Sequence, residues 1–463
     1  MSGQASIRRG AVASVAIVLA AASLAGCNGR GGSGLWYRAS TPVVLTGSQV
    51  PTFATKNPGS IVAFRWNSEQ RGWEQVPVQV DERHTEFLTK LRNGSGTTGP
   101  TTLAYSDPAA NAGPDPTTTL DADDEIAFMA KDTGGEAPRK AAAPAGVVST
   151  SGIRVAVTDP LAPTDATRGW GVGFLYLFER STPTLVPAAG QDYVAYTFAP
   201  ADPTGHVENS TVSTARYTTH FSARWTRDGL SLGSGPDIID RHRNLFAVGN
   251  CSRSEDTMSA GPGGYATNIN GPVRVIRSYL GANSGTYTQR EHLFYQGAER
   301  VQTTLRVHAI PGILDFYDYS VAAIGMQYAS SSTPTAVTID GVPDATGSGA
   351  PTWEAVTGAQ GTMVSASTID SDIVGLTIGA YYLDDSTPPA TQCTGDAFEY
   401  GASGTAITSP LPNTDPTLGA FNNLVATRWN LYAPGTETPD IDRQVANLVA
   451  PVTVVLTAFA PSS

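Results

Sequence analysis

The sequence predicts an all-β protein built from antiparallel β-sandwiches. Glycine (48 residues) and proline (32 residues) occur throughout it, and only 15% of its residues are charged. Short segments rich in valine, isoleucine, threonine and aromatic residues lie between these turn-forming residues. Strands at this density, without helical periodicity between them, favour antiparallel sandwiches over a fold of alternating strands and helices.

Many segments have the composition or the alternation of a β-strand. In chain order, the clearest are residues 61–66, 73–82, 125–130, 153–158, 172–179, 193–199, 220–225, 273–280, 290–295, 303–310, 336–340, 374–383 and 452–460. A proline-containing stretch near residues 180–190 separates two groups of strands. We therefore expect a smaller N-terminal β domain over 35–185 and a larger β-sandwich domain over 186–463.

One short helix is predicted near the C-terminus, in residues 439–450. Pro439 can start a helix, and the apolar residues that follow recur at helical spacing. These residues are Ile441, Val445, Leu448 and Val449.

The first 27 residues have the order of a secretory signal. Arg8 and Arg9 precede an apolar run without acidic residues, and the run ends in LAGC at residues 24–27. This ending resembles the lipobox of bacterial lipoproteins, which implies that Cys27 becomes lipidated. The protein would then be anchored in the bacterial cell envelope, facing the periplasm or the exterior. Residues 28–34 predict a flexible tether. The alternative is an ordinary secretory signal with an incidental cysteine.

The net charge and the absence of several catalytic motifs argue against some classes of protein, and the cysteines predict a disulfide. A formal charge of −12 argues against DNA or RNA as a partner. The two cysteines after Cys27 are Cys251 and Cys393, and an oxidising compartment predicts a disulfide between them. The chain has no GxSxG, HExxH, P-loop or dinucleotide-binding motif.

The segment TQREHLFY, residues 288–295, is a predicted strand with an unusual cationic side. It lies between two other strand-like segments, so two successive hairpins are expected. If Leu280 pairs with Thr286 and Tyr295 pairs with Val301, five basic residues share one sheet face. These are Arg274, Arg290, His292, Arg306 and His308.

Like charges opposite one another destabilise a sheet unless an anion lies between them. One alternative is an internal network with carboxylates. The other is a groove in which the five basic residues bind an external anion, such as an acidic glycan. A one-residue slip in the pairing would scatter the set.

The sequence GPVRVIRSYLGAN, residues 271–283, resembles part of the supersandwich of the galactose-mutarotase-like superfamily, which several polysaccharide lyases carry. The resemblance implies a supersandwich-like larger domain with a sheet face that holds sugar. In a lyase, arginine neutralises the uronate carboxylate while histidine or tyrosine takes the proton. The candidate catalytic residues are therefore His292, His308, Arg290 and Arg306.

The stretch from Asp107 to Glu125 is strongly acidic and contains no basic residue. Clustered carboxylates on a loop repel one another unless a cation lies among them, and calcium accepts such ligands. The candidate calcium ligands are Asp121, Asp123, Asp124 and Glu125. A solvated acidic turn before a strand is the alternative.

Aromatic residues provide a further possible sugar-binding element, because tryptophan stacks on sugar rings. A place in the sandwich core is the alternative for each. The tryptophans are Trp36, Trp66, Trp73, Trp170, Trp225, Trp353 and Trp429.

These observations leave three hypotheses about function. The first is a lipid-anchored envelope protein that binds a glycan, acidic or neutral, on the cationic face. The second is a polysaccharide lyase or other carbohydrate-active enzyme on the same face. The third is a calcium-stiffened structural surface lipoprotein whose partner is another protein.

Overall fold

The computed structural model describes residues 35–162, 171–246, 251–283, 285–306, 309–387, 392–412 and 423–459. The predicted signal sequence with Cys27, the predicted tether, Trp170 and His308 lie outside these described residues.

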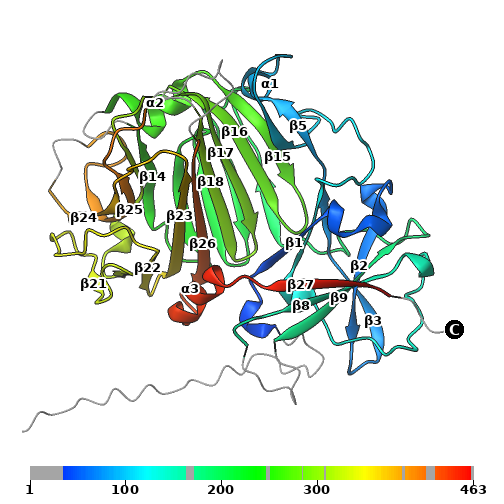
Figure 1. Cartoon of the computed structure of the whole chain (residues 1–463). Helices are drawn as coiled ribbons and strands as arrows, with labels where there is room; N and C mark the ends of the chain where they lie inside the picture. Colours follow the sequence, from blue (N-terminus) through cyan, green and yellow to red (C-terminus); the bar gives the residue numbers. More distant parts are fainter. Residues whose placement is uncertain are drawn as a thin grey trace, which may run out of the picture. The chain divides into compact units, whose positions relative to one another are not determined.

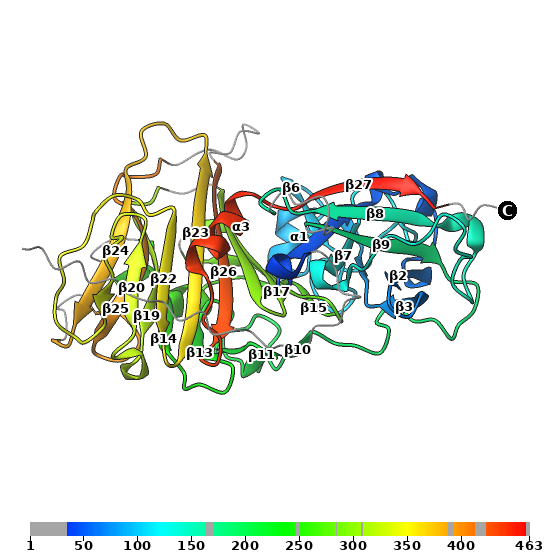
Figure 2. The same ribbon diagram turned by 90° about the horizontal axis from the view of Figure 1, so that it is seen from below.

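A nine-stranded antiparallel sheet is the largest element of the fold (Figure 1, Figure 2). Side chains alternate along each strand, so the sheet has two distinct faces. In spatial order its strands are β15 (Gly264–Asn270), β16 (Val275–Ala282), β17 (Gly285–Tyr295), β18 (Ala298–Arg306), β26 (Asn423–Pro434), β23 (Gly361–Ser371), β22 (Trp353–Gly358), β20 (Gln327–Ser330) and β21 (Val337–Thr338).

Two four-stranded sheets cover one face of the nine-stranded sheet, which we call the inner face. The first has the order β10 (Val194–Thr197), β11 (Ser210–Thr214), β12 (Tyr217–Phe221) and β13 (Arg227–Leu232). The second has the order β14 (Ile239–Leu245), β19 (Ile313–Tyr319), β25 (Glu399–Ile407) and β24 (Ile378–Asp385).

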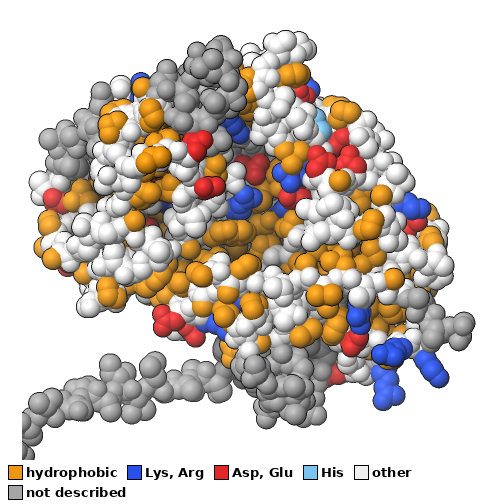
Figure 3. All heavy atoms as spheres, viewed as in Figure 1, with side chains coloured by type: hydrophobic (Ala, Val, Ile, Leu, Met, Phe, Trp, Pro, Cys, Tyr) orange, Lys and Arg blue, Asp and Glu red, His pale blue; other side chains and the backbone are white. Residues whose placement is uncertain are grey.

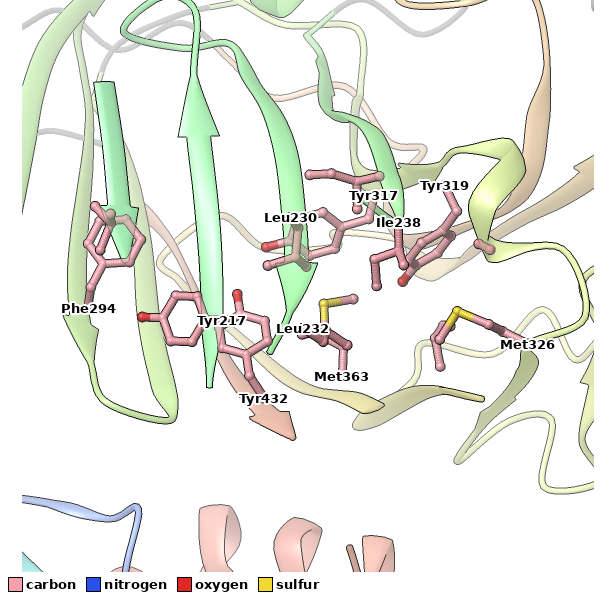
Figure 4. Close-up of a cluster of buried hydrophobic side chains, with 14 of the residues drawn as sticks. Tyr217, Leu230, Leu232, Ile238, Phe294, Tyr317, Tyr319, Met326, Met363 and Tyr432 are labelled. Carbon is pink, nitrogen blue, oxygen red and sulfur yellow. The ribbon is translucent and has the colours of Figure 1, made fainter. Parts of the chain in front are cut away.

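A buried apolar cluster joins the inner face to these two covering sheets (Figure 4). Phe294, Met363 and Tyr432 come from the nine-stranded sheet, while Leu230 and Tyr319 come from the covering sheets. All five are nearly inaccessible to solvent. Burial of such side chains contributes roughly 1.5–3 kcal/mol each, so this sandwich contains a main core of the protein.

The N-terminal strands form three smaller sheets. The three-stranded sheet contains β1 (Pro42–Thr46), β7 (Glu125–Met129) and β4 (Gln79–Asp81), and the two-stranded sheet contains β5 (Arg83–Phe87) and β6 (Thr101–Tyr105). The five-stranded sheet has the order β27 (Thr453–Ala458), β8 (Ile153–Thr158), β9 (Val172–Glu179), β2 (Ile61–Asn67) and β3 (Gly72–Val76). These strands lie beside the second face of the nine-stranded sheet, the outer face (Figure 1).

The last strand returns to the N-terminal sheets. Thr453 to Ala458 of β27 pair with Thr158 to Ile153 of β8. Val454 and Leu456 pack on the apolar cluster of that region. The sequence assigns these C-terminal residues to the larger domain, whereas the structure places them in the five-stranded sheet. The boundary near residue 185 otherwise stays a prediction.

Three short α-helices are present among the described residues. α1 (Leu88–Asn93) and α2 (Glu255–Ala260) are six-residue helices that the sequence does not predict. α3 (Ile441–Val449) confirms the predicted C-terminal helix. Asp440 caps its N-terminus, because its carboxylate accepts a hydrogen bond from the backbone N–H of Arg443 at 2.9 Å.

The predicted all-β antiparallel fold is confirmed. The two hairpins around TQREHLFY are also confirmed, because β16 pairs with β17 and β17 pairs with β18. The predicted disulfide joins Cys251 to Cys393 across a sequence separation of 142 residues. Some strands central to the large sheet, β23 and β26 among them, are absent from the sequence prediction.

Candidate functional site

The outer face of the nine-stranded sheet carries a groove made of three adjoining clefts. The polar cleft has a volume of about 320 Å³, the middle cleft about 340 Å³ and the far cleft about 440 Å³. The polar and middle clefts share Glu125 and Arg300, while the middle and far clefts share Trp429. Figure 3 shows this side of the molecule hollowed, with apolar, basic and acidic side chains around the hollow.

Side chains alternate between the two faces along β17 and β18, and those that point to the outer face form one wall of the polar cleft. Glu291 of β17 is the Cα partner of Gln302 of β18, so both side chains point to the outer face. The side chains that this wall contributes are Gln289, Glu291, Arg300, Gln302, Thr304 and Arg306. The opposite wall comes from the N-terminal strands and includes Arg83, Tyr105 and Glu125.

Two arginines in the polar cleft have no carboxylate partner among the described residues. Arg300 donates a hydrogen bond to the side chain of Gln302. Arg306 donates to the side chain of Gln289 at 2.8 Å and to the backbone oxygen of Tyr287 at 3.2 Å. Burial lowers the pKa of Arg306 to about 10, while the charge of Glu291 opposes this shift. Arg306 therefore remains cationic near neutral pH. Neither guanidinium group is bound to a carboxylate, so both are available to an anion.

Glu291 is the unusual carboxylate of the polar cleft. Its half-buried side chain makes no hydrogen bond and no ion pair with another described residue. Burial raises the pKa of Glu291, and the nearby charges of Arg300 and Arg83 only partly offset this effect. A buried carboxylate without a partner is costly to keep ionised, so this group is suited to taking up a proton.

Glu125 behaves in the opposite way on the facing wall. It accepts hydrogen bonds from Arg83 Nη1 at 2.8 Å, from Tyr105 Oη at 2.7 Å and from Arg274 Nη2 at 2.8 Å. Burial alone would raise the pKa of Glu125, but the charges of Arg274 and Arg83 lower it below its usual range. Glu125 is therefore a fixed anion, and its wall of the cleft is held by ion pairs.

The middle cleft is largely apolar and contains an aromatic pair. Trp429 of β26 stacks on Tyr295 of β17, with ring centroids 6.3 Å apart and an interplanar angle of 20°. Trp429 is half-buried, so part of its ring remains accessible in the groove. Leu293 and Val43 complete its apolar lining. An accessible indole beside apolar side chains is a suitable surface for stacking a sugar ring.

The far cleft lies beside α3. Tyr37, which is 44% exposed, and Leu448 of α3 line it together with Trp429. Arg216 and Glu437 form a two-bond ion pair there, with distances of 2.9 and 2.6 Å. The charges at this end of the groove thus neutralise each other, in contrast to the polar cleft.

The predicted register of the cationic strands is wrong. Leu280 pairs with Gln289 instead of Thr286, and Arg277 rather than Arg274 lies opposite His292. Arg290 lies opposite Thr303 instead of Arg306. The five predicted basic residues therefore do not form one face: Arg290 and His292 lie on the inner face, whereas Arg274 and Arg306 lie on the outer side.

Arg290 belongs to an internal network, which is the alternative that the sequence left open. It is 1% exposed and donates to Asp315 Oδ2 at 2.8 Å. His242 also contacts Asp315, at 2.8 Å, and burial lowers the pKa of His242 to about 4. Arg428 completes the network around this carboxylate.

His292 belongs to a second internal network. Its Nδ1 lies 2.9 Å from Glu299 Oε1, and its Nε2 lies 3.1 Å from the hydroxyl of Tyr279. Burial lowers the pKa of His292 to about 3, despite the opposing effect of Glu299. Arg227 forms an ion pair with the same glutamate at 2.7 Å. His292 is therefore a neutral core residue that cannot contact a ligand in the groove.

Arg274 also forms ion pairs with acidic residues of the protein itself. Its guanidinium lies 2.6 Å from Asp81 and 2.8 Å from Glu125. Of the predicted ligand-binding residues, only Arg306 faces the polar cleft with no acidic partner. His308 lies outside the described residues.

The acidic loop brings three of the four predicted calcium ligands together. One carboxylate oxygen from each of Asp121, Asp123 and Asp124 lies within 4.8 Å of the others. Burial and the neighbouring Asp121 raise the pKa of Asp123 to about 6. Glu125 instead takes part in the arginine network of the polar cleft. The calcium site stays a prediction, with Glu125 outside its cluster.

A second acidic cluster surrounds one arginine near the disulfide. Asp240, Asp318 and Asp396 each offer a carboxylate oxygen within 4.8 Å of the others. Arg243 Nη2 lies 2.5 Å from Asp318 and 3.8 Å from Asp240. Burial raises the pKa of Asp318 to about 8, and Arg243 only partly opposes this shift.

Sequence reasoning missed Arg300 and Glu291 as functional candidates. Their signal is the polar alternation in AERVQTTLR, residues 298–306, beside TQREHLFY. That alternation shows which residues share a face. It does not show that this face remains open, because the covering strands come from distant parts of the chain.

Comparisons with known proteins give little further information. No protein-family model matches the chain, and no curated protein matches it. A structure from Escherichia coli K12, described as a candidate aldose 1-epimerase, is similar over 52% of this chain and 100% of that chain. The sequence identity is 8% and the TM-score is 0.30, so this likeness carries no conclusion about function. Within the described segments, no helix combines the length and the apolar character needed to cross a bilayer.

Proposed function

We propose that this protein is a lipid-anchored envelope protein that binds an elongated glycan in the groove of the outer face. The observation that carries the proposal is a row of paired residues that crosses five strands of the outer face. The row begins with Leu293, Arg300 and Trp429, which line the groove. It continues past the clefts to Ala366 and Trp353 on the two following strands.

The row has the spacing of a sugar-binding platform. Neighbouring strands lie about 4.8 Å apart, so Trp429 and Trp353, two strands apart, are separated by roughly 10 Å. Both tryptophans are half-buried, and Ala366 between them has a small side chain. Aromatic rings on either side of a small residue allow a chain of sugar rings to lie flat across the strands.

The polar cleft adds a charged end to this platform. Arg300 belongs both to the row and to the polar cleft, and Arg306 lies further along β18. The unpaired arginines favour a glycan with an acidic residue at this position. Aromatic stacking in the middle of the groove and charge at one end together support an extended ligand over a compact one.

The sequence supports the proposed location in the bacterial cell envelope. The LAGC ending at residues 24–27 and the tether at 28–34 motivate lipidation at Cys27. A lipid at this position would hold the folded body near the membrane of the bacterial envelope. Mass spectrometry of the mature protein, before and after lipase treatment, tests the modification.

Affinity electrophoresis tests glycan binding directly. The mature protein without Cys27 would be run through gels that contain neutral glycans (galactan, glucan, xylan) or acidic ones (polygalacturonate, alginate). We expect retardation by at least one glycan, loss of retardation in Trp429→Ala, and partial loss in Trp353→Ala. Trp429→Phe is the matched control, because it keeps a ring in the groove. Equal retardation of wild type and Trp429→Ala by every bound glycan would contradict the proposal.

A second candidate function, cleavage of the bound glycan, is favoured by one observation. Glu291 is a half-buried carboxylate with a raised pKa and no partner, and it faces the groove. Such a group is suited to proton transfer. New reducing or unsaturated ends after incubation with a bound glycan, and their absence with Glu291→Gln, would support an enzyme. Unchanged glycan length with wild type would leave binding alone.

A further inference from the structure

The charges of the polar cleft do not balance within the cleft itself. Arg83 and Glu125 pair with each other across 2.8 Å. Arg300 and Arg306 remain without acidic partners, and Glu291 remains without a basic one. The cleft therefore presents two cations and one anion that form no ion pair, which leaves one net positive charge.

The pairing of the strands explains this arrangement. Glu291 lies opposite Gln302, so Arg300 is its diagonal neighbour on β18 and Arg306 lies two outward-facing positions beyond Gln302. Diagonal neighbours on a sheet are about 7–8 Å apart. Arg300 is held by Gln302, and Arg306 is held by Gln289. Neutral amides thus occupy the hydrogen bonds that a carboxylate would otherwise make with these guanidinium groups.

We propose that the polar cleft binds a carboxylate-bearing sugar residue through Arg300 and Arg306, and that Glu291 takes up a proton when this residue binds. This inference rests on the proposed glycan-binding function. It specifies a carboxylate-bearing sugar at one end of the groove and links the binding of that sugar to protonation of Glu291.

Proton uptake follows from the charges that face Glu291. The neighbouring strands contribute Arg83 from β5, Tyr105 from β6, Glu125 from β7, and Arg300 and Arg306 from β18, while Arg274 precedes β16. Arg83 and Arg274 are already neutralised by Glu125 and Asp81. A sugar carboxylate at Arg300 and Arg306 would take up their remaining positive charge. The two arginine charges would then be shared between the sugar carboxylate and Glu291, and the added anion would further raise the pKa of Glu291, which burial already raises.

Protonation removes this repulsion and supplies a donor. A neutral Glu291 carboxyl group can donate its O–H to the sugar carboxylate, whereas an ionised group can only accept hydrogen bonds. The affinity for the acidic sugar should consequently rise as the pH falls. A like charge at this distance in a partly buried cleft changes affinity by roughly tenfold. A neutral sugar would bind without proton uptake.

Isothermal titration calorimetry measures the proton uptake itself. The probes are an oligogalacturonate, whose carboxyl groups are ionised, and its methyl ester, whose carboxyl groups are neutral and carry a methyl group. Titrations at about pH 5, about 6.5 and about 8, each in two buffers of different ionisation enthalpy, give the number of protons taken up. For wild type and the oligogalacturonate we expect net uptake of up to one proton and roughly tenfold weaker binding at the highest pH.

Variants separate Glu291 from other titrating groups. We expect Glu291→Gln to bind the oligogalacturonate without proton uptake and with little dependence on pH. Arg306→Gln should bind the acid no better than the methyl ester. Glu179→Gln is the control, because Glu179 pairs with Lys56 away from the groove and should keep the wild-type proton uptake.

Each outcome decides between the proposals. Proton uptake that persists in Glu291→Gln overturns the assignment of Glu291, and equal affinity of wild type for acid and ester overturns the anionic subsite. Binding of the methyl ester alone, with loss in Trp429→Ala, overturns this inference but keeps the glycan-binding function. Lack of binding to both probes overturns this inference; lack of binding to every glycan of the electrophoresis panel overturns the proposed function as well.

Discussion

Arg274 and Glu125 form an ion pair in which Nη2 lies 2.8 Å from Oε2. The sequence assigns these two residues to different sites, Arg274 to an anion-binding face and Glu125 to a calcium loop. In the structure each is the partner of the other, and they join the large sheet to β7 beside the groove. The pair fixes one wall of the polar cleft and leaves Arg300, Arg306 and Glu291 as its reactive groups.

Removing the charge of Arg274 should destabilise the protein. Arg274→Gln leaves Asp81 and Glu125 without their shared cation, and breaking a buried pair costs about 3–5 kcal/mol. Urea unfolding followed by circular dichroism measures the loss. Lys56→Gln, which removes the half-exposed pair with Glu179, should cost less than about 1 kcal/mol. Similar losses in the two variants would contradict a structural role for Arg274.

Arg290 and Arg306 should respond differently to the same substitution. Arg290→Gln removes a cation from the internal network around Asp315, so we expect lower stability, by about 3 kcal/mol or more. Arg306→Gln removes a cation that faces the cleft without a carboxylate, so we expect weaker binding of acidic glycans with little change in stability. Paired measurements of unfolding and glycan affinity check both expectations. A loss of affinity in Arg290→Gln without a loss of stability would indicate that it acts as a ligand-binding residue.

Stability should fall as the pH drops from about 6.5 towards 4. Burial lowers the pKa of His242 to about 4 and that of His292 to about 3, from an ordinary value of 6.5. Between these values the unfolded chain binds protons that the folded chain does not, so acid favours unfolding. Each histidine contributes up to about 1.4 kcal/mol per pH unit. The melting temperature as a function of pH would show the fall.

A substitution isolates the contribution of His292 to this acid sensitivity. His292→Gln keeps a polar side chain but cannot be protonated, so its melting temperature should decline less steeply below about pH 6.5 than that of wild type. His220→Gln serves as the control, because His220 is half-exposed. Identical slopes for wild type and His292→Gln would show that this histidine does not control the acid response.

Calcium should stabilise the protein through Asp121, Asp123 and Asp124. Burial and Asp121 raise the pKa of Asp123 to about 6, and a bound cation would relieve this crowding of carboxylates. We expect added calcium to raise the melting temperature by a few degrees at about pH 7, and by less at about pH 5, where protons compete. Asp123→Asn should lose this response. An equal response in wild type and Asp123→Asn would rule out this cluster as the site.

Loss of the disulfide should reduce stability substantially. Cys251 and Cys393 are separated by 142 residues, and a closed loop of this length contributes roughly 4–5 kcal/mol in the chain-entropy model. Replacing both cysteines by serine should lower the free energy of unfolding by about that amount and the urea midpoint accordingly. Wild type with reductant should behave like the double variant, and a midpoint unchanged by either treatment would contradict this contribution.

The sequence predicts those parts of the fold that depend on neighbouring residues. The hairpins on either side of TQREHLFY and the helix near residue 441 follow from local alternation and turn composition. Strand β26 was missed because Arg428, Asn430 and Thr427 interrupt its apolar pattern. These polar side chains are tolerated because Arg428 and Asn430 find partners on strands far away in the sequence.

The candidate site was only partly predictable for the same reason. A three-residue difference in the pairing of Leu280 moves Arg290 and His292 to the inner face, where Asp315 and Glu299 neutralise them. Turn composition alone does not fix that register. Arg306 lines the polar cleft, but its neighbours across the cleft come from β5, β6 and β7, which the sequence pattern cannot place beside β18.

The pairing of β27 with β8 also sets the order in which this protein can fold during synthesis. The N-terminal strands are made first, yet their five-stranded sheet lacks its edge strand until Thr453–Ala458 have been made. Contacts between such distant segments form slowly. During that interval β8 presents an unpaired edge that can pair with other chains. This edge is closed only when β27 pairs with it.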